Sequence, residues 1–136
     1  MIVTDRDLII KKSTIPGAGK GLFTKISIAK GTHIIEYKGK ISTWKDVDHQ
    51  EGSNSYIYYV SKNYVIDGQP FIKEKARYAN DARGLTRIKG ISNNCRYTQV
   101  KRKVFIEARK SIAAGSEILV DYGKEYWDTV KLNAKC

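Results

Sequence analysis

Short apolar runs separated by turn residues recur along the 136-residue chain, and this pattern predicts a mostly-β fold. The clearest run is Ile118–Val120, whose apolar and partly β-branched residues suit a buried strand. It stops at Asp121, Tyr122 and Gly123, so a carboxylate, a phenol and a turn residue follow one another at a strand end. Rigid scaffolds commonly present reactive groups at such ends. Taken alone, the stretch also fits a core strand followed by a turn.

The remaining elements are short. Leu8–Ile10 predicts an edge strand, and Tyr56–Val60 with Tyr64–Asp67 predicts a hairpin. A capping-box pattern at Thr43–Asp46 indicates the start of a short helix. Lys73–Asn80 predicts a helix of about two turns, followed by a polar loop over residues 81–94 and a resumed sheet at Val104–Ile106.

One strand-turn-strand pattern occurs twice. The segment Phe23–Gly39 is echoed by Phe105–Gly123 at an offset of 84 residues, which predicts two small sheets related by a rough pseudo-symmetry. The residues that recur are Ser27, Ile28, Ala29, Gly31, Ile34 and Gly39, matched by Ser111, Ile112, Ala113, Gly115, Ile118 and Gly123.

A glycine-rich loop lies within Ile15–Phe23. Its three glycines in five residues indicate positive φ angles or a close approach of another group to the backbone. A phosphate-binding P-loop is excluded because Thr14 stands where the first glycine should be. The dinucleotide fingerprint is excluded because Leu22 occupies the third glycine position.

Length and composition indicate one domain over residues 1–136, without an internal linker. No apolar run approaches the ~18 residues of a membrane span, so we expect no membrane contact. The N-terminus carries acids where a signal peptide carries bases, and we expect a location inside a cell or a host cell. Two cysteines and two scattered histidines form no zinc-spacing pattern, so no metal is expected.

The formal net charge is +11, from 25 Lys and Arg against 14 Asp and Glu. Such an excess favours polyanionic partners: nucleic acid, a nucleosome or an acidic protein. Lys101–Lys103 is the only dense basic cluster in the sequence.

Four pieces of the chain occur in an order and at a spacing that resemble the SET-domain family, protein lysine methyltransferases that use S-adenosylmethionine. The resemblance covers about residues 10–127 and leaves a short tail, 128–136. Its C-terminal end looks most like the minimal single-domain SET proteins of large algal viruses and some bacteria. The four pieces are Gly19–Phe23, Tyr56–Tyr59 followed by Ile66 and Asp67, Arg77–Asn80 with Asn94 and Cys95, and Glu117–Gly123.

The resemblance implies several small β-sheets with short helices and a C-terminal pseudoknot, in which the Tyr122 segment passes through a loop formed by the Asn94 segment. It also implies that S-adenosylmethionine and the target lysine enter from opposite faces and meet in a narrow channel. The substrate would be a histone or another DNA-associated protein, with contact to nucleosomal DNA left open. The oligomeric state is also open, a homodimer included.

By the same resemblance, Tyr122 is the catalytic phenol, and Tyr56 and Tyr97 line the substrate channel. Tyr97 would limit how many methyl groups the amine accepts. The remaining expectations concern the cofactor. Main-chain groups of the glycine loop would hold it, and the indole of Trp127 would stack against its adenine. The residues expected to bind it are Gly19, Lys20, Gly21, Tyr56, Arg77, Asn80, Asp81, Tyr122 and Trp127. Tyr58, Tyr59 and Tyr78 are expected to pack in the sheets.

The chain departs from the family at Asn80–Ala82, where relatives usually have Asn-His-Ser, and by about ten inserted residues between Ala82 and Asn93. In the family the residue after the asparagine holds the cofactor through its backbone, so Asp81 would act through its main chain. The departure keeps a catalytically silent SET-like binding module as an alternative. A small basic β-domain that binds nucleic acid through aromatic and basic side chains is the other alternative.

Overall fold

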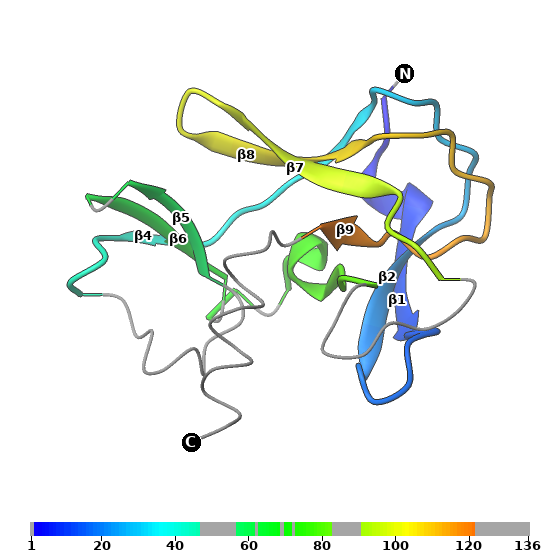
Figure 1. Ribbon diagram of the computed structural model, residues 1–136, viewed down its shortest axis with the longest axis horizontal. Helices are drawn as coiled ribbons and strands as arrows, with labels where there is room; N and C mark the ends of the chain where they lie inside the picture. The colour runs from blue at the N-terminus through cyan, green and yellow to red at the C-terminus, as the bar shows by residue number, and fades with distance from the viewer. Residues whose placement is uncertain are drawn as a thin grey trace.

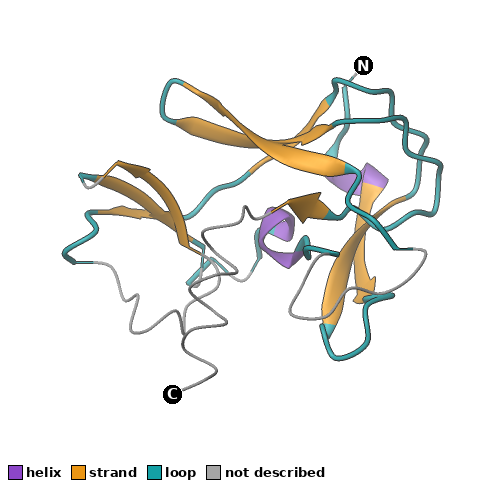
Figure 2. Cartoon of the chain, in the orientation of Figure 1, coloured by secondary structure: helices purple, strands orange, loops and turns teal. Residues whose placement is uncertain are grey.

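The computed structural model describes residues 2–46, 57–61, 63–68, 70–71, 73–82 and 91–121. Within these ranges strands predominate and the helices are two short 3-10 segments, so the expected mostly-β class is confirmed (Figure 2). The elements are η1 (Asp5–Asp7), β1 (Leu8–Lys12), β2 (Lys20–Thr24), β3 (His33–Glu36), β4 (Lys40–Ser42), β5 (Ile57–Ser61), β6 (Tyr64–Asp67), η3 (Lys75–Tyr78), β7 (Cys95–Val100), β8 (Lys103–Ala108) and β9 (Val120–Asp121). Neither described helix has the length or the apolar character needed to cross a membrane.

The strands form three small sheets (Figure 1). β1 and β2 pair as a two-stranded sheet, β3-β8-β7-β9 form a four-stranded sheet, and β4-β6-β5 form a three-stranded sheet. All neighbours are antiparallel except β7 and β9. The long β7–β8 hairpin reaches from the middle of the molecule toward the β5–β6 hairpin.

The two repeated segments pair with each other through reciprocal hydrogen bonds. Ile28 and Ile112 exchange backbone bonds of 2.8 and 2.9 Å. The N–H of Gly31 donates to the carbonyl of Ala108, and the equivalent N–H of Gly115 donates to Thr24, both at 2.7 Å. Gly31 and Gly115 also share a φ near +90°, at 89° and 88°. The predicted pseudo-symmetry is therefore present as a local two-fold relation centred on the Ile28–Ile112 bridge. The prediction of two separate sheets is wrong, because β3 and β8, one from each repeat, pair in a single four-stranded sheet.

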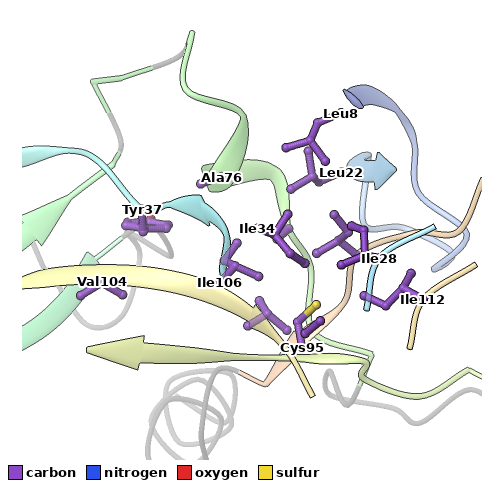
Figure 3. Close-up of a cluster of buried hydrophobic side chains, with 14 of the residues drawn as sticks. Leu8, Leu22, Ile28, Ile34, Tyr37, Ala76, Cys95, Val104, Ile106 and Ile112 are labelled. Carbon is purple, nitrogen blue, oxygen red and sulfur yellow. The ribbon is translucent and has the colours of Figure 1, made fainter. Parts of the chain in front are cut away.

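The main core lies where the sheets meet, and Figure 3 shows side chains from distant segments converging there. Leu22, Ile106, Ile118 and Val120 are fully shielded from solvent. Each such side chain contributes roughly 1.5–3 kcal/mol through burial. The thiol of Cys95 belongs to this cluster, and burial raises its pKa to about 12. It is therefore a structural and not a reactive group at neutral pH.

The segment that leads to Tyr122 runs between two other parts of the chain. On one side, Leu119 forms a parallel bridge with Asn80, and the N–H of Val120 donates to the Asn80 carbonyl at 2.8 Å. On the other side, the N–H groups of Asn94 and Cys95 donate to the Leu119 carbonyl at 2.9 and 3.0 Å. The strand before Tyr122 is therefore flanked on both sides, and the expected passage of the Tyr122 segment through a loop remains a prediction, because residues 122–136 lie outside the described ranges.

Several predicted elements are confirmed: the edge strand within β1, the β5–β6 hairpin and the strand within β8. Others differ. Strand β2 starts at Lys20, inside the predicted glycine loop, and the predicted helix over 73–80 is reduced to η3, because Asn80 is extended and pairs with Leu119. Strands β4 and β7 were not predicted. The helix start at Thr43 is a turn in which Asp46 donates to Thr43, and residues 47–56 lie outside the described ranges.

Candidate functional site

The buried carboxylate of Glu117 is the centre of a polar network beneath the glycine loop. Only 6% of Glu117 is exposed. It accepts hydrogen bonds from the Ser13 hydroxyl at 2.7 Å, the Thr14 N–H at 2.9 Å and the Thr14 hydroxyl at 2.6 Å. Since a buried charge is stable only when several donors surround it, this set anchors the start of the loop to the strand that carries Glu117.

Glycine is needed in this loop for two different reasons. Gly17 and Gly19 have φ angles of 78° and 72°, with open space where a Cβ would point. At Gly21 a Cβ would run into the Glu117 carboxylate and lie 3.2 Å from the Ser13 Cβ. The loop is closed by a hydrogen bond from the Ser13 N–H to the Gly19 carbonyl at 2.8 Å. The backbone at Gly19 is thus accessible, whereas Gly21 makes room for the protein's own carboxylate.

Asn80 joins the glycine loop to the strand that ends before Tyr122. Its amide Nδ2 donates to the Lys20 carbonyl at 3.0 Å and lies 3.5 Å from the Glu117 Oε2. Its own carbonyl accepts from Val120. One residue therefore contacts both segments expected to surround the cofactor.

Asn94 holds the other side of the same strand with both ends of its side chain. Its Nδ2 donates to the Glu117 carbonyl at 2.9 Å, and its Oδ1 accepts from the Leu119 N–H at 2.9 Å. Asn94 is 9% exposed, so both bonds are shielded from water. A buried side chain that satisfies backbone groups in this way fixes the position of the strand end.

The departure at Asn80–Ala82 has a structural partner. The buried Asp81 carboxylate accepts from the Asn93 Nδ2 at 2.8 Å, and the Ala82 N–H donates to the Asn93 Oδ1 at 2.8 Å. These two bonds tie together the ends of the inserted segment, of which residues 83–90 lie outside the described ranges. The Asp81 side chain thus closes the insertion, and a main-chain role for Asp81 toward the cofactor remains a prediction.

Arg77 contacts the turn after β6 and its own neighbour in η3. Its Nη1 donates to the Gly68 carbonyl at 3.1 Å, and its guanidinium lies 5.3 Å from the centre of the Tyr78 ring. These contacts brace η3 against the turn after β6. Its predicted participation in cofactor binding therefore has no direct support from these contacts.

Tyr97 lies in a second cluster, made of three phenols. Its ring meets the buried Tyr37 ring edge-on at 5.8 Å and the Tyr58 ring at 5.2 Å. Burial raises the pKa of Tyr58, so its phenol is uncharged at neutral pH. The packing role expected for Tyr58 is compatible with these contacts, and they place it beside a predicted channel residue.

Among the predicted site residues, the structure brings Gly19, Lys20, Gly21 and Asn80 together. Tyr56, Tyr122 and Trp127 lie outside the described residues, so their predicted roles remain predictions. Sequence reasoning missed Glu117 as the anchor, along with Ser13 and Thr14. A polar pair directly before a glycine loop was the one available signal, and nothing in the sequence connects it to a residue about 100 positions away.

Within the described ranges, no three His, Cys, Asp or Glu side chains gather as metal ligands would. The site instead combines an accessible glycine loop, a buried polar network beneath it and a separate phenol cluster. The three small sheets that carry these features are consistent with the SET class of folds. A family model described as SET domain matches residues 19–123, and the chain belongs to this family.

Curated relatives have names that agree with this assignment. Histone-lysine N-methyltransferase set-1 of Caenorhabditis elegans is 26% identical over 129 residues, covering 85% of this chain and 50% of the relative. Histone-lysine N-methyltransferase ash1 of Drosophila melanogaster is 29% identical over 114 residues, covering 76% of this chain and 5% of the relative. N-lysine methyltransferase KMT5A-A of Xenopus laevis is 25% identical over 138 residues, covering 90% and 38%. The chain thus spans half or less of these relatives.

A solved structure supports the fold alone. The methyltransferase domain of human PR domain-containing protein 2 superposes with a TM-score of 0.65 at 23% identity, covering 88% of this chain and 79% of that chain. The likeness to minimal viral and bacterial members remains a prediction.

Proposed function

We propose that this chain is an S-adenosylmethionine-dependent protein lysine N-methyltransferase that acts on a histone or another DNA-associated protein. The observation that carries the proposal is the position of Asn80. Through its side chain and its carbonyl, Asn80 joins the glycine loop to the strand that ends before Tyr122. Sequence pieces about 60 and 40 residues away from Asn80 thus converge on one residue, as a cofactor pocket requires.

The residues present fit the cofactor. Gly19 has open space on the side where other residues carry a Cβ, so a ligand can approach its backbone closely. Main-chain groups of Gly19, Lys20 and Gly21 would hold S-adenosylmethionine, with Asn80 keeping the loop in place and Trp127 stacking on the adenine. When bound, the cofactor would supply a methyl group from its sulfonium.

The chain's own task is to align the lysine and keep its amine neutral. A free lysine has a pKa near 10.4, so roughly one in a few thousand is neutral at pH 7. Desolvation lowers the pKa of an amine, and phenols can orient it without adding charge. Tyr56 and Tyr97 would line this channel, with Tyr122 as the catalytic phenol. The contacts of Tyr97 with Tyr37 and Tyr58 support an aromatic wall at this place.

The partner would be a protein that presents a lysine, and the names of the relatives support a histone. We expect the protein to work inside a cell, in the nucleus or the cytoplasm. Nucleosomal DNA and a second copy of the chain remain candidate partners.

A thermal shift measurement with S-adenosylmethionine tests the first step. A ligand present at 100 times its dissociation constant stabilises the folded state by about 2.7 kcal/mol. We expect stabilisation of this size, and S-adenosylhomocysteine should reproduce most of it. The absence of any shift with either ligand would contradict the proposal and favour the nucleic-acid-binding alternative.

Transfer of labelled methyl groups to a panel of histones and nucleosomes, read by mass spectrometry, tests the activity. Tyr122→Phe should abolish transfer while cofactor binding largely survives, because the variant lacks only the hydroxyl. Tyr59→Phe is the matched control, since Tyr59 is 53% exposed and lies against Trp44. Equal loss in both variants, or retained activity in Tyr122→Phe, would show that the phenol is wrongly assigned.

A catalytically silent binding module is the second candidate, favoured by the use of Asp81 to close the insertion. It predicts a thermal shift with S-adenosylmethionine and no transfer to any substrate in the panel.

A further inference from the structure

The tip of the β7–β8 hairpin presents three consecutive cations. Val100 pairs with Lys103, so Lys101 and Arg102 form a two-residue turn, and all three basic side chains are exposed. Lys38 adds a fourth charge, because it follows Tyr37, whose N–H donates to the Val104 carbonyl next to Lys103. These four residues, Lys38 and Lys101–Lys103, are called the basic tip below.

The turn is built on an unfavourable residue. Lys101 has a φ of 57° and is the single non-glycine residue with positive φ in the described part of the chain. Tight two-residue hairpin turns strongly prefer glycine, asparagine or aspartate at such a position. A lysine there costs backbone energy that glycine would not, and such strain is typical of positions retained for function. Backbone preference alone therefore does not explain a lysine at position 101.

Ion pairs form at the base of the hairpin, whereas the acid nearest in register to the tip, Glu36, lies opposite Phe105, two residues from Lys103. Arg96 lies 2.8 Å from Glu107, and Arg109 lies 4.0 Å from Asp121. None of the basic-tip residues takes part in an ion pair with the residues that the structure describes. Their charge is left available to a partner.

Two contacts hold the tip in place. The Arg102 guanidinium lies 5.1 Å from the centre of the Tyr64 ring, which connects the β7–β8 hairpin to the β5–β6 hairpin (Figure 1). The Gln99 Nε2 donates to the Lys101 carbonyl at 3.1 Å. The Arg102 side chain and the backbone of the turn are thus held in place, so Arg102 loses less side-chain freedom when it binds.

We propose that the basic tip binds the phosphate backbone of duplex DNA. Three lysines and an arginine without an ion pair among the described residues suit an extended polyanion, since each cation can contact a separate phosphate. Tyr97 lies on β7, four residues before Lys101 in the turn, roughly 13 Å away at about 3.3 Å per residue. DNA at the tip would therefore run beside the phenol cluster, where a DNA-associated substrate would present its lysine. DNA binding requires neither cofactor nor methyl transfer. A negative result for DNA binding can therefore be distinguished from a failure of the proposed methyltransferase activity.

Lys101→Gly separates the two roles of this residue. Glycine adopts positive φ freely, so the thermal midpoint should stay the same or rise. Affinity for a fluorescently labelled 20-base-pair duplex should fall. The slope of the logarithm of the association constant against the logarithm of the salt concentration should become shallower by about 1. Lys101→Arg should restore the affinity. An affinity and salt slope unchanged in Lys101→Gly would overturn the proposal.

A second comparison separates a localised site from bulk charge. In one variant Lys101, Arg102 and Lys103 are all replaced by glutamine. In the control variant three other exposed lysines, Lys25, Lys30 and Lys110, are replaced by glutamine, so the net charge changes equally. We expect the tip variant to weaken duplex binding at least ten-fold at 50 mM salt and the control variant less than three-fold. Equal losses would overturn the proposal, as would tighter binding of wild type to poly-glutamate than to the duplex at matched salt.

Discussion

The region around Glu117 and the region around Tyr97 use opposite means to shape a binding site. Around Glu117, a buried carboxylate gathers hydroxyl, amide and backbone donors from Ser13, Thr14 and Asn80. Around Tyr97, the aromatic rings of Tyr37 and Tyr58 pack edge-on against the Tyr97 ring. The first region fixes backbone in space, whereas the second provides a wall without net charge.

This difference corresponds to the two tasks of the proposed reaction. A cofactor held by main-chain groups needs a loop whose shape does not change, and a hydrogen-bonded carboxylate can impose that shape. An amine that must lose its proton needs surroundings that add no negative charge, because a carboxylate would stabilise the ammonium form. We therefore expect changes around Glu117 to affect stability and cofactor binding, and changes around Tyr97 to affect the treatment of the lysine.

Glu117→Ala should have the largest effect. It leaves the buried Ser13 hydroxyl without its acceptor and releases the exposed Thr14 from the strand, and the expected loss is about 3 kcal/mol in the free energy of unfolding. S-adenosylmethionine binding should be lost with it. Urea denaturation and calorimetry measure the two effects, and Glu36→Ala is a control carboxylate in the same protein. A loss below about 1 kcal/mol would show that the network does not hold the loop.

Gly21→Ala should have the next largest effect, because its Cβ would meet the Glu117 carboxylate. Overpacking of this kind costs typically about 1–3 kcal/mol. In the double variant with Glu117→Ala, the alanine has space, so the two losses should be clearly less than additive. Additive losses in urea denaturation would mean that Gly21 is needed for another reason than the approach of Glu117.

The contrast between Gly19 and Gly21 shows how far the sequence could be interpreted. The glycine spacing correctly indicated either positive φ or close approach, and both occur, one at each residue. The sequence could not predict which glycine has the positive φ and which one is approached closely by another group. The group that approaches Gly21 comes from Glu117, 96 positions later, and only the tertiary fold brings the two together.

Local sequence patterns predicted the strands correctly where turn residues bound them, as in the β5–β6 hairpin. They also predicted the two equivalent turns of the 84-residue repeat. They missed β7 because Arg96 and Gln99 interrupt its apolar positions, although Tyr97, Thr98 and Val100 favour a strand. Pairing with both β8 and β9 makes it a strand nonetheless. They also failed at Asn80, where pairing with Leu119 overrides helix propensity.

Tyr97→Phe should leave the cofactor affinity and the fold nearly unchanged, because the two edge-on ring contacts do not need the hydroxyl. The expected change is in the number of methyl groups on the product, read by mass spectrometry. Tyr97→Ala removes both ring contacts, each worth about 0.5–1.5 kcal/mol, and should lower the free energy of unfolding by about 2 kcal/mol. If Tyr97→Phe weakened S-adenosylmethionine binding as strongly as Glu117→Ala, the division between the two regions would be wrong.

Glu107→Gln should have the smallest effect, because the partners of this carboxylate, Arg96 and His33, are exposed to water. Like Glu117, Glu107 has several donors, but its main partner, Arg96, has a side chain that is 62% exposed. Hydrogen bonds from Arg96, with a smaller contribution from His33, hold the pKa of Glu107 below its usual range. A lowered pKa stabilises the fold above the unfolded-state value and ceases to do so as pH falls through the folded-state value. Glu107→Gln should therefore cost less than about 1 kcal/mol at pH 7, and the difference from wild type should shrink below about pH 4. A difference in the free energy of unfolding that stays constant from pH 7 to pH 3 would mean that the charge of Glu107 contributes nothing, and that its packing against the sheet accounts for the whole effect.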